Sequence, residues 1–271
     1  MSAVDVRIRR AEGLDDYLAC VQLQKEVWNY TEMEDIAAQP MLMIGDRFGG
    51  SVLVAQDAER YIGFSFAMPG WKADKKPFWW SHMTAVLAEY RNLDIGLALK
   101  FRQREVAISE GIDLIEWTFD PLQALNAHFN VCKLGVLVKE YEENVYGYTS
   151  SPLHRGLPTD RFVAEWNLNA ERVRLRADSP RNAVIMRDID RMQNINASGG
   201  EPNLSIVDSP LLLEIPFDLN AVKGGDIERA KHWQAGIRKA CQHYFRLGYA
   251  VTDFIRLEKP RLQALYVLEK N

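Results

Sequence analysis

The stretch VLAEYRNLDIGLALK, residues 86–100, runs from an apolar strand end through a turn into an amphipathic helix. A helix N-terminus presents backbone N–H groups without intrahelical partners and the positive end of the helix dipole, and both favour a bound phosphate. Glycine is the usual residue in such a turn, but this chain has Asp94 there. The stretch therefore predicts a strand–turn–helix unit that suits an anion and carries one residue that opposes it.

The composition is that of an ordinary globular protein. The chain has 271 residues, 47% of them hydrophobic, and a formal charge of -4. This balance provides no cationic field to attract nucleic acid or an anionic membrane. No apolar run approaches the roughly 18 residues of a membrane helix, and the first ten residues lack the apolar core of a signal peptide. We expect a cytoplasmic protein with neither nucleic acid nor membrane as a partner.

The three cysteines, Cys20, Cys132 and Cys241, are odd in number and far apart, and each lies inside a helical pattern. This spacing argues against a disulfide framework and against a metal site. We interpret them as reduced packing residues.

Predicted strands and helices lie on both sides of residues 86–100. Residues 51–86 predict three antiparallel strands, with turns at 57–60 and 69–77. A strand at 4–11 precedes a helix at 14–28, whose core-facing stripe is expected to be Leu14, Leu18, Val21 and Val27. The other expected elements are a helix within 31–44, a strand at 112–119, a helix ending at Gly135, and strands within 136–146 and 161–168.

Composition also predicts the domain organisation. Residues 1–168 form a mixed α/β domain, and residues 169–203 are polar and Gly/Pro-marked, which indicates a linker with one short helix. Residues 204–271 predict a β-α-β-β extension. Because that piece is small, we expect it to pack on the first domain.

Several motifs resemble one known family. RNLDIG, residues 91–96, has the spacing of the R-x-x-G-x-G turn that binds the acetyl-CoA pyrophosphate in the GNAT acetyltransferase superfamily. SHMTAV, WTFDPLQALNAHFNVCKLG and GLPTDRFVAEW are similar to segments of predicted GNAT acetyltransferases that carry a C-terminal extension. The resemblance covers nearly the whole chain. It implies the α/β GNAT fold with a C-terminal β-α-β-β extension and acyl transfer from acetyl-CoA or another acyl-CoA, but it implies no particular acceptor.

The resemblance also implies a cofactor site, from which this chain departs at two positions. Asp94 replaces the first required glycine and Asn92 replaces the glycine usual after the arginine, so a carboxylate and an extra Cβ oppose the phosphates. Asp94 has a second interpretation, since an acidic residue complements the dipole in the first turn of a helix. The expected cofactor-binding residues are Thr84, Ala85, Val86, Arg91, Asn92, Leu93, Asp94, Ile95, Gly96, Asn126 and Asn130.

The catalytic groups are less clearly marked. Many GNAT enzymes have a general-acid tyrosine at the position of Val131, so Tyr141 is a candidate replacement, as are His128, Cys132 and Tyr146. His82 and Asp120 are the candidate bases. Strand alternation places His82 on one face with Trp80, Thr84 and Val86. His82 could instead be held by hydrogen bonds in the strand, and Asp120 could cap a helix that starts at Pro121.

Acceptor recognition is expected from the region between the first two helices, which lines the acceptor side in the GNAT fold. The candidate residues are Trp28, Glu32, Glu34 and Trp80, and an acidic rim would suit a small-molecule amine. Residues 31–34 also fit a helix capping box. Two alternatives stay open: a GNAT-like ligand-binding protein that has lost CoA binding, and an interaction module in which the extension fills the cleft or makes a homodimer.

Overall fold

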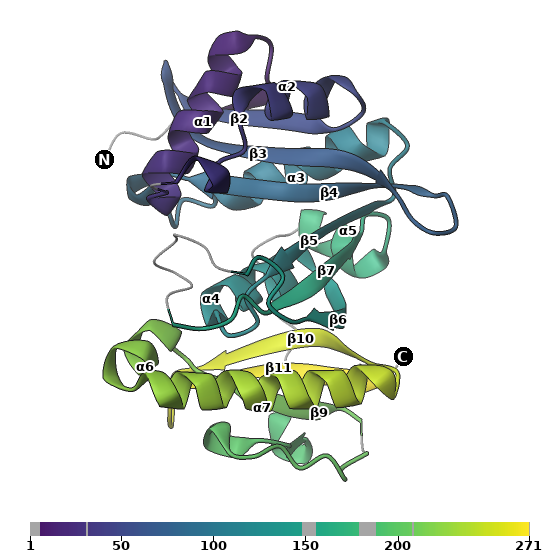
Figure 1. The fold of residues 1–271 in the computed structure, drawn as a ribbon. Helices are drawn as coiled ribbons and strands as arrows, with labels where there is room; N and C mark the ends of the chain where they lie inside the picture. Colours follow the sequence, from purple (N-terminus) through teal and green to yellow (C-terminus); the bar gives the residue numbers. More distant parts are fainter. Residues whose placement is uncertain (1–5, 31, 148–155, 179–187, 208, 271) are drawn as a thin grey trace. The chain divides into compact units, whose positions relative to one another are not determined.

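A computed structural model describes residues 6–30, 32–147, 156–178, 188–207 and 209–270 (Figure 1). These residues form two compact units, and each is described by itself. The first unit contains residues 6–30, 32–117 and 167–169, and the second contains the remaining described residues. The units do not coincide with the segments 1–168, 169–203 and 204–271 expected from composition, and that division stays a prediction.

The first unit is a sheet with strand order β1-β2-β3-β4-β5. Its neighbouring strands are antiparallel except for β4 and β5, which are parallel. Its elements are β1 Val6–Arg10, α1 Leu14–Trp28, η1 Met33–Asp35, α2 Gln39–Arg47, β2 Ser51–Asp57, β3 Arg60–Trp71, β4 Pro77–Val86, η2 Ala88–Tyr90, α3 Ile95–Ser109 and β5 Leu114–Phe119.

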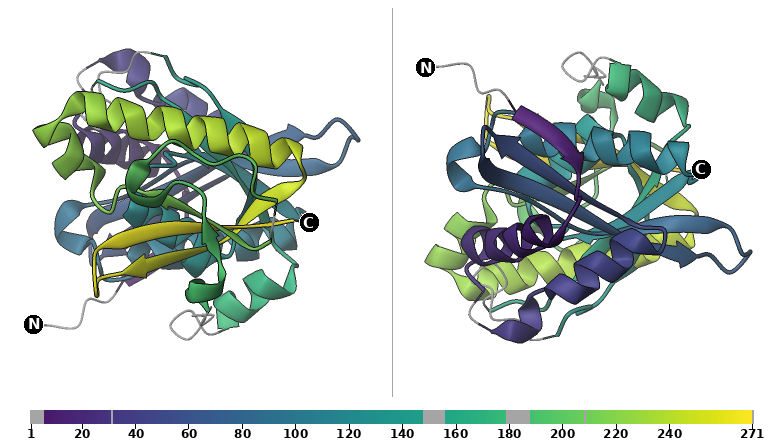
Figure 2. Two further views of the ribbon diagram at one scale, coloured as in Figure 1. Left: turned by 90° about the horizontal axis from the view of Figure 1, so that it is seen from below. Right: turned by 90° about the horizontal axis from the view of Figure 1, so that it is seen from above.

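Helices cover both faces of this sheet, with α1 and α2 on one side and α3 on the other (Figures 1 and 2). Trp28 of α1 packs edge-on against Phe64, with ring centroids 6.3 Å apart. A Cβ at Gly45 of α2 would lie 2.6 Å from the ring of Phe66, so this helix approaches β3 closely. Alternate residues of β3 therefore face the α1–α2 side, and the residues between them face α3.

The buried face of α1 differs from the expected stripe. Leu14 and Leu18 are 58% and 48% exposed, and the buried face is formed by Asp16, Tyr17, Cys20, Leu23 and Gln24. The expectation was wrong because polar residues of α1 find partners that lie far away in the sequence. Asp16 accepts hydrogen bonds from Arg9 and Tyr61, and Gln24 exchanges two with the backbone of Ala37.

Two local predictions also need correction. The helix expected within residues 31–44 is a single 3₁₀ turn, Met33–Asp35, followed by α2 with Pro40 in its first turn. Glu32 is the N-cap of the 3₁₀ turn and makes no side-chain capping bond, while Thr31 of the expected capping box lies outside the described residues. The turn expected at 69–77 is shorter, because β3 continues to Trp71 and β4 begins at Pro77.

The second unit has strand order β7-β6-β10-β11-β9-β8. The extension joins the sheet through β10, where Val251 pairs with Val138 of β6. Its elements are α4 Ala124–Ala127, η3 His128–Leu134, β6 Leu137–Glu142, β7 Arg161–Asn167, α5 Glu171–Asp178, η5 Ile189–Arg191, β8 Gln193–Asn194, η6 Ala197–Gly199, β9 Leu211–Ile215, α6 Leu219–Gly225, α7 Ile227–Arg246, β10 Tyr249–Leu257 and β11 Gln263–Lys270.

The predicted mixed α/β fold class is confirmed, and so is the order of elements that the GNAT resemblance implies. One strand and the helical segments α1, η1 and α2 precede three antiparallel strands, and α3, β5, the helical segment α4–η3 and two strands follow. All three cysteines are free thiols. Within the described ranges, no helix combines the length and apolar character needed to cross a membrane.

Candidate functional site

The strands β4 and β5 part soon after they meet. Their parallel ladder consists of two rungs, Trp79↔Ile115 and Trp80↔Glu116. Among the described residues of the first unit, residues 81–86 of β4 form no rung with β5, although β4 stays paired with β3 along this length. The outer backbone edge of β4 beyond Trp80 is therefore outside the β4–β5 ladder. Such an edge can hydrogen-bond an extended ligand as a neighbouring strand would.

A β-bulge lies at the start of this edge, and it corrects the expected orientation of His82. Ser81 pairs with Ala67 and faces α3, whereas Met83 pairs with Phe66, whose ring lies against α2. Ser81 and Met83 would share a face in a regular strand, so His82 is the extra residue of a bulge.

The bulge divides the residues that alternation had grouped. The His82 ring packs edge-on against Phe66 on the α1–α2 side, with ring centroids 6.1 Å apart. Trp80 shares that side, because its partner Met68 lies against Gly45 of α2. Val86, in contrast, lies with Leu99 of α3 beside Gly63 on the opposite side, and Thr84 belongs to that face too. The expectation that His82 faces the same way as Thr84 and Val86 was therefore wrong.

The turn between η2 and α3 has a glycine-like backbone at two residues that are not glycine. Asn92 and Asp94 have φ values of 65° and 56°, in the left-handed region. They are the two positions at which this chain departs from the R-x-x-G-x-G turn, whose last glycine is present as Gly96. Asn and Asp are the non-glycine residues that tolerate this region best. The chain thus keeps the conformation of the turn while changing its side chains.

This turn leaves backbone donors at the start of α3. The first intrahelical bond runs from the Ala98 N–H to the Asp94 carbonyl, at 2.9 Å, so the N–H groups of residues 95–97 precede the helical ladder. Asp94 is exposed, and its carboxylate makes no capping hydrogen bond to the described first turn. The hydrogen-bonded N-cap is therefore absent, and only the position of Asp94 near the positive helix end supports its structural interpretation.

Contacts with the β2–β3 turn hold the approach to this loop. The Tyr90 hydroxyl donates to Asp57 at 2.9 Å, and Arg60 pairs with Glu89 at 2.6 Å. Gly96 lies against β4, since a Cβ there would be 3.8 Å from Cγ2 of Val86. Arg91 and Leu93 are exposed, whereas Ile95 is buried. The turn is fixed at both ends and open to solvent between them.

The candidate base His82 is exposed to solvent. Desolvation by the surrounding protein lowers its pKa, so the imidazole is neutral near pH 7 and can accept a proton. Thr84 and Val86 are half-buried. Ala85 is buried and pairs with Phe64 on the α1–α2 side.

A buried lysine at the parting of the strands was missed in the sequence. Lys100 of α3 is 3% exposed. Its Nζ donates to Ser81 Oγ at 2.9 Å and to Gln103 Oε1 at 3.0 Å, and it lies 3.7 Å from the centre of the Trp117 ring. Desolvation lowers the pKa of Lys100 well below its ordinary value. In the sequence only its position between core-facing residues of α3 hinted at burial.

The expected acceptor residues of the first unit are spread over several elements. Trp28 ends α1 and is half-buried against Phe64 and Tyr30. Trp80 is half-buried on the α1–α2 side. Glu32 and Glu34 are exposed at the 3₁₀ turn. Their role in binding an amine stays a prediction.

The remaining candidates belong to the second unit. Asp120 accepts a hydrogen bond from the Leu122 N–H at 2.9 Å, but the following helix begins at Ala124 with Gln123 as its N-cap. The expected helix cap at Asp120 is therefore a turn that precedes the helix. Burial raises the pKa of Asp120. Asn126 is exposed, and Asn130 is buried and donates to Asn126 at 3.2 Å.

The segment after α4 contains Val131, the position at which many GNAT enzymes have the general-acid tyrosine. Residues His128–Leu134 are π-helical and end at Gly135, whose φ is 80°. Val131 is fully buried within it. Cys132 donates from its thiol to the Phe254 carbonyl at 2.9 Å, and burial raises its pKa to about 12. Desolvation lowers the pKa of His128. Cys132 is thus engaged in packing the helix on β10, as expected for a structural thiol.

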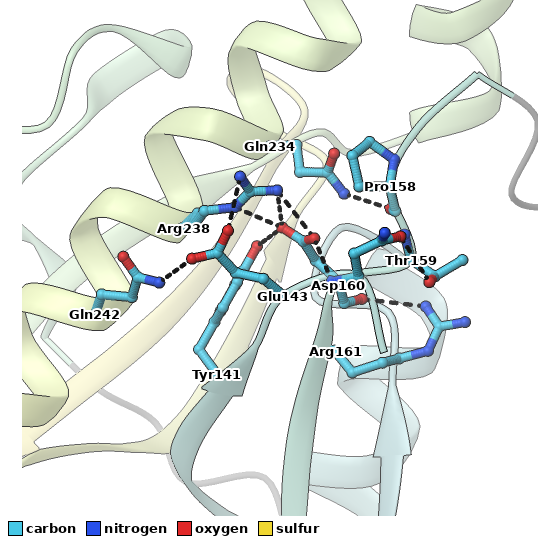
Figure 3. Close-up of polar contacts among 10 residues, drawn as sticks. Tyr141, Glu143, Pro158, Thr159, Asp160, Arg161, Gln234, Arg238 and Gln242 are labelled. Atoms are coloured by element: carbon cyan, nitrogen blue, oxygen red, sulfur yellow. Dashed lines mark hydrogen bonds and ion pairs between the residues drawn. The ribbon is translucent and has the colours of Figure 1, made fainter. Parts of the chain in front are cut away.

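Tyr141 is held in a polar cluster (Figure 3). Its hydroxyl donates to Oδ2 of Asp160 at 2.5 Å, and burial with this hydrogen bond raises its pKa. Asp160, whose side chain is fully buried, also binds both ends of the Arg238 guanidinium and the Asn144 N–H. A tyrosine with a raised pKa is a weak proton donor, so this cluster favours a structural role for Tyr141.

The candidates therefore fall into two groups. His82, the β4 edge, the turn at 91–96 and the acceptor residues lie in the first unit, while Asp120, Asn126, Asn130 and Tyr141 lie in the second. That the two groups act together stays a prediction.

Comparison with known proteins adds likenesses of structure. No protein-family model and no curated protein sequence matches the chain. Similar solved structures include two acetyltransferases described as members of the GNAT family and the acetyltransferase Naa50. A protein from Desulfovibrio desulfuricans assigned to that family is 16% identical, covering 60% of this chain and 99% of its own, with a TM-score of 0.49. A GNAT-family acetyltransferase from Streptococcus pneumoniae is 15% identical over 59% and 98%, with a TM-score of 0.48. Naa50 of Arabidopsis thaliana, solved with a CoA-containing bisubstrate analogue, is 14% identical over 60% and 98%, with a TM-score of 0.47.

Proposed function

We propose that the protein is an acyl-CoA-dependent N-acyltransferase that transfers an acetyl or other acyl group directly to a small-molecule amine. One observation carries the proposal: β4 leaves the β4–β5 ladder after Trp80 and leads into a turn with a glycine-like backbone at the N-terminus of α3. The edge suits an extended amide-containing arm, and the helix start suits a pyrophosphate. Both lie within the first unit.

The backbone groups of β4 and of the start of α3 suit the binding of an acyl-CoA. Residues 81–86 of β4 would hold the pantetheine arm, and the N–H groups of residues 95–97 would bind phosphate oxygens. Arg91, exposed at the start of the turn, supplies a positive charge. The thioester of the acyl-CoA supplies the acyl group, and the chain orients it and polarises its carbonyl through backbone donors.

His82 is the proposed base. Its neutral imidazole, directly or through a water, takes one proton from the ammonium group of the acceptor, which leaves a neutral amine as the nucleophile. The new bond joins the amine nitrogen to the acyl carbon, the bond between that carbon and sulfur breaks, and the leaving thiolate takes up the second proton that the nitrogen loses. Asp120 stays a second candidate for proton transfer, because burial raises its pKa.

Asp94 sets the expected affinity. If its carboxylate lies roughly 6 Å from a phosphate charge, the repulsion is about 0.7–2.8 kcal/mol for an effective dielectric constant of about 80 to 20. Removing that charge should tighten binding roughly 3- to 100-fold at low salt.

Calorimetric titration with acetyl-CoA and with CoA tests the proposal. Asp94→Asn removes the charge and keeps the side-chain volume, while Asp94→Gly also removes the Cβ. Ala58→Gly is a matched control, because Ala58 has a φ of 51° in another turn of the same unit. We expect the native chain to bind, both Asp94 variants to bind more tightly, and Ala58→Gly to bind like the native chain. If neither the native chain nor an Asp94 variant binds, the proposal is wrong.

A second candidate is a GNAT-like ligand-binding protein without catalytic activity. The carboxylate of Asp94 on the phosphate turn favours it, and so does buried Val131 at the usual position of the general acid. In that case only the Asp94 variants would bind CoA, and the native pocket would accept a less anionic ligand.

A further inference from the structure

Lys100 lies at the branch point of β4 and β5. The last rung of their ladder is Trp80↔Glu116, so Ser81 and Trp117 are the first residues beyond it. The Nζ of Lys100 contacts both of them, through the hydrogen bond to Ser81 Oγ and through the face of the Trp117 ring. A single side chain from α3 thus joins the two strands where their pairing ends.

The same contacts fix the start of the bulge. Ser81 Oγ also donates to Gln103 Oε1 at 3.1 Å, so Lys100, Ser81 and Gln103 form a closed triangle of hydrogen bonds. The bulged residue His82 follows Ser81 directly and turns to the opposite face of the sheet. Holding Ser81 against α3 therefore sets the direction in which the backbone of residues 82–83 and the His82 ring leave the branch point.

A lysine is a costly choice for a role of packing alone. Burying an amine in a helix–sheet interface opposes folding, and an apolar side chain of the same length would fill this space at a lower cost. The Nζ of Lys100 is the donor in its hydrogen bonds to Ser81 and Gln103, and desolvation lowers its pKa.

We propose that Lys100 is a positioning residue for the acyl group, which anchors Ser81 and Trp117 and so fixes the branch point and the bulge beside which the acyl-CoA binds. The link to the acyl group rests on the proposed function, whereas the anchoring of β4 does not.

Hydrogen exchange of the chain without ligand tests the anchoring. Lys100→Met keeps the length of the side chain and removes its polar contacts, and Ser81→Ala removes the same contact from the other side. Arg102→Met is the matched control, because Arg102 lies in the same helix and is 47% exposed. We expect both test variants to accelerate exchange at residues 81–84 at least 10-fold. We also expect Lys100→Met to keep or raise the melting temperature.

Binding then tests the link to the acyl group. We expect Lys100→Met and Ser81→Ala to weaken acetyl-CoA binding at least 10-fold and Arg102→Met to leave it unchanged. If exchange at residues 81–84 merely follows global stability, the anchoring role is wrong. If exchange changes locally but acetyl-CoA affinity does not, the link to the acyl group is wrong. A native chain that binds no acyl-CoA refutes the proposed function and that link, while the exchange experiment still decides the anchoring.

Discussion

Replacing Arg238 by methionine should destabilise the second unit strongly. Arg238 of α7 binds Asp160 through Nε at 2.9 Å and through Nη2 at 3.0 Å, and the carboxylate is fully buried (Figure 3). Breaking a buried ion pair costs about 3–5 kcal/mol, because a charge is left without its partner. Asp160 keeps two donors, Tyr141 and the Asn144 N–H, and Arg238 is 29% exposed, so the lower part of the range applies. We expect a loss of about 2–4 kcal/mol, which is roughly 5–15 °C in Tm.

Urea and thermal unfolding followed by circular dichroism measure this loss. The control is Lys231→Met, because Lys231 lies on the same helix and its pair with Glu228 is exposed, so a change within about 0.5 kcal/mol is expected. Adding Asp160→Asn to Arg238→Met should recover part of the loss, since the buried charge is then gone. A loss below about 1 kcal/mol for Arg238→Met, or one equal to that of the control, would refute the reasoning.

Three further predictions use the first unit. The hydrogen bond from Arg9 lowers the pKa of Asp16 to about 2. This pair therefore stabilises the fold fully above about pH 4, and about 2 kcal/mol of unfolding free energy is lost as the pH falls toward 2. In urea unfolding, Asp16→Asn should remove this dependence of the unfolding free energy on pH. Gly45→Ala places a Cβ 2.6 Å from the Phe66 ring and should cost about 1–3 kcal/mol of unfolding free energy, whereas Gly13→Ala meets nothing within 4 Å and should cost less. With His82 as base, the acid limb of kcat/KM should lie below pH 6.5 and disappear in His82→Ala, because desolvation lowers the pKa of His82; an unchanged limb would exclude His82.

The sequence was sufficient for the elements whose signals are local. The three-stranded meander at 51–86 and the helix end at Gly135 follow from alternation and from turn residues, and the structure has both. The buried face of α1 could not be predicted in this way. Asp16 and Gln24 are buried because Arg9, Tyr61 and the backbone of Ala37 satisfy them, and those partners are 7 to 45 residues away.

The strand, turn and helix start within residues 86–100 were predictable from the sequence, whereas the orientation of side chains along β4 was not. Residues 80–86 alternate regularly in the sequence, so nothing there marks the bulge that turns His82 away from Thr84 and Val86. Lys100 was missed because lysine is almost never fully buried. In addition, its partners Ser81 and Trp117 come from the strands β4 and β5, whereas Lys100 lies in α3. Tertiary contacts, which a single sequence does not display, decide both features.

A glycine in a phosphate-binding turn both adopts a left-handed backbone and leaves room for the phosphate. In the turn at 91–96 the left-handed backbone is kept, but Asp94 adds a Cβ and a charge. A left-handed residue other than glycine costs about 1–2 kcal/mol, so the conformations of Asn92 and Asp94 must be stabilised by contacts on either side of them. Tyr90 bound to Asp57 and buried Ile95 provide such contacts. We infer that these contacts, rather than the side chains at 92 and 94, arrange the backbone donors, so under the proposed function the charge of Asp94 is expected to be the main obstacle to a phosphate. Asp94→Asn should consequently bind acetyl-CoA nearly as tightly as Asp94→Gly. A large advantage of the glycine variant alone would mean that the Cβ, and not the charge, obstructs the turn.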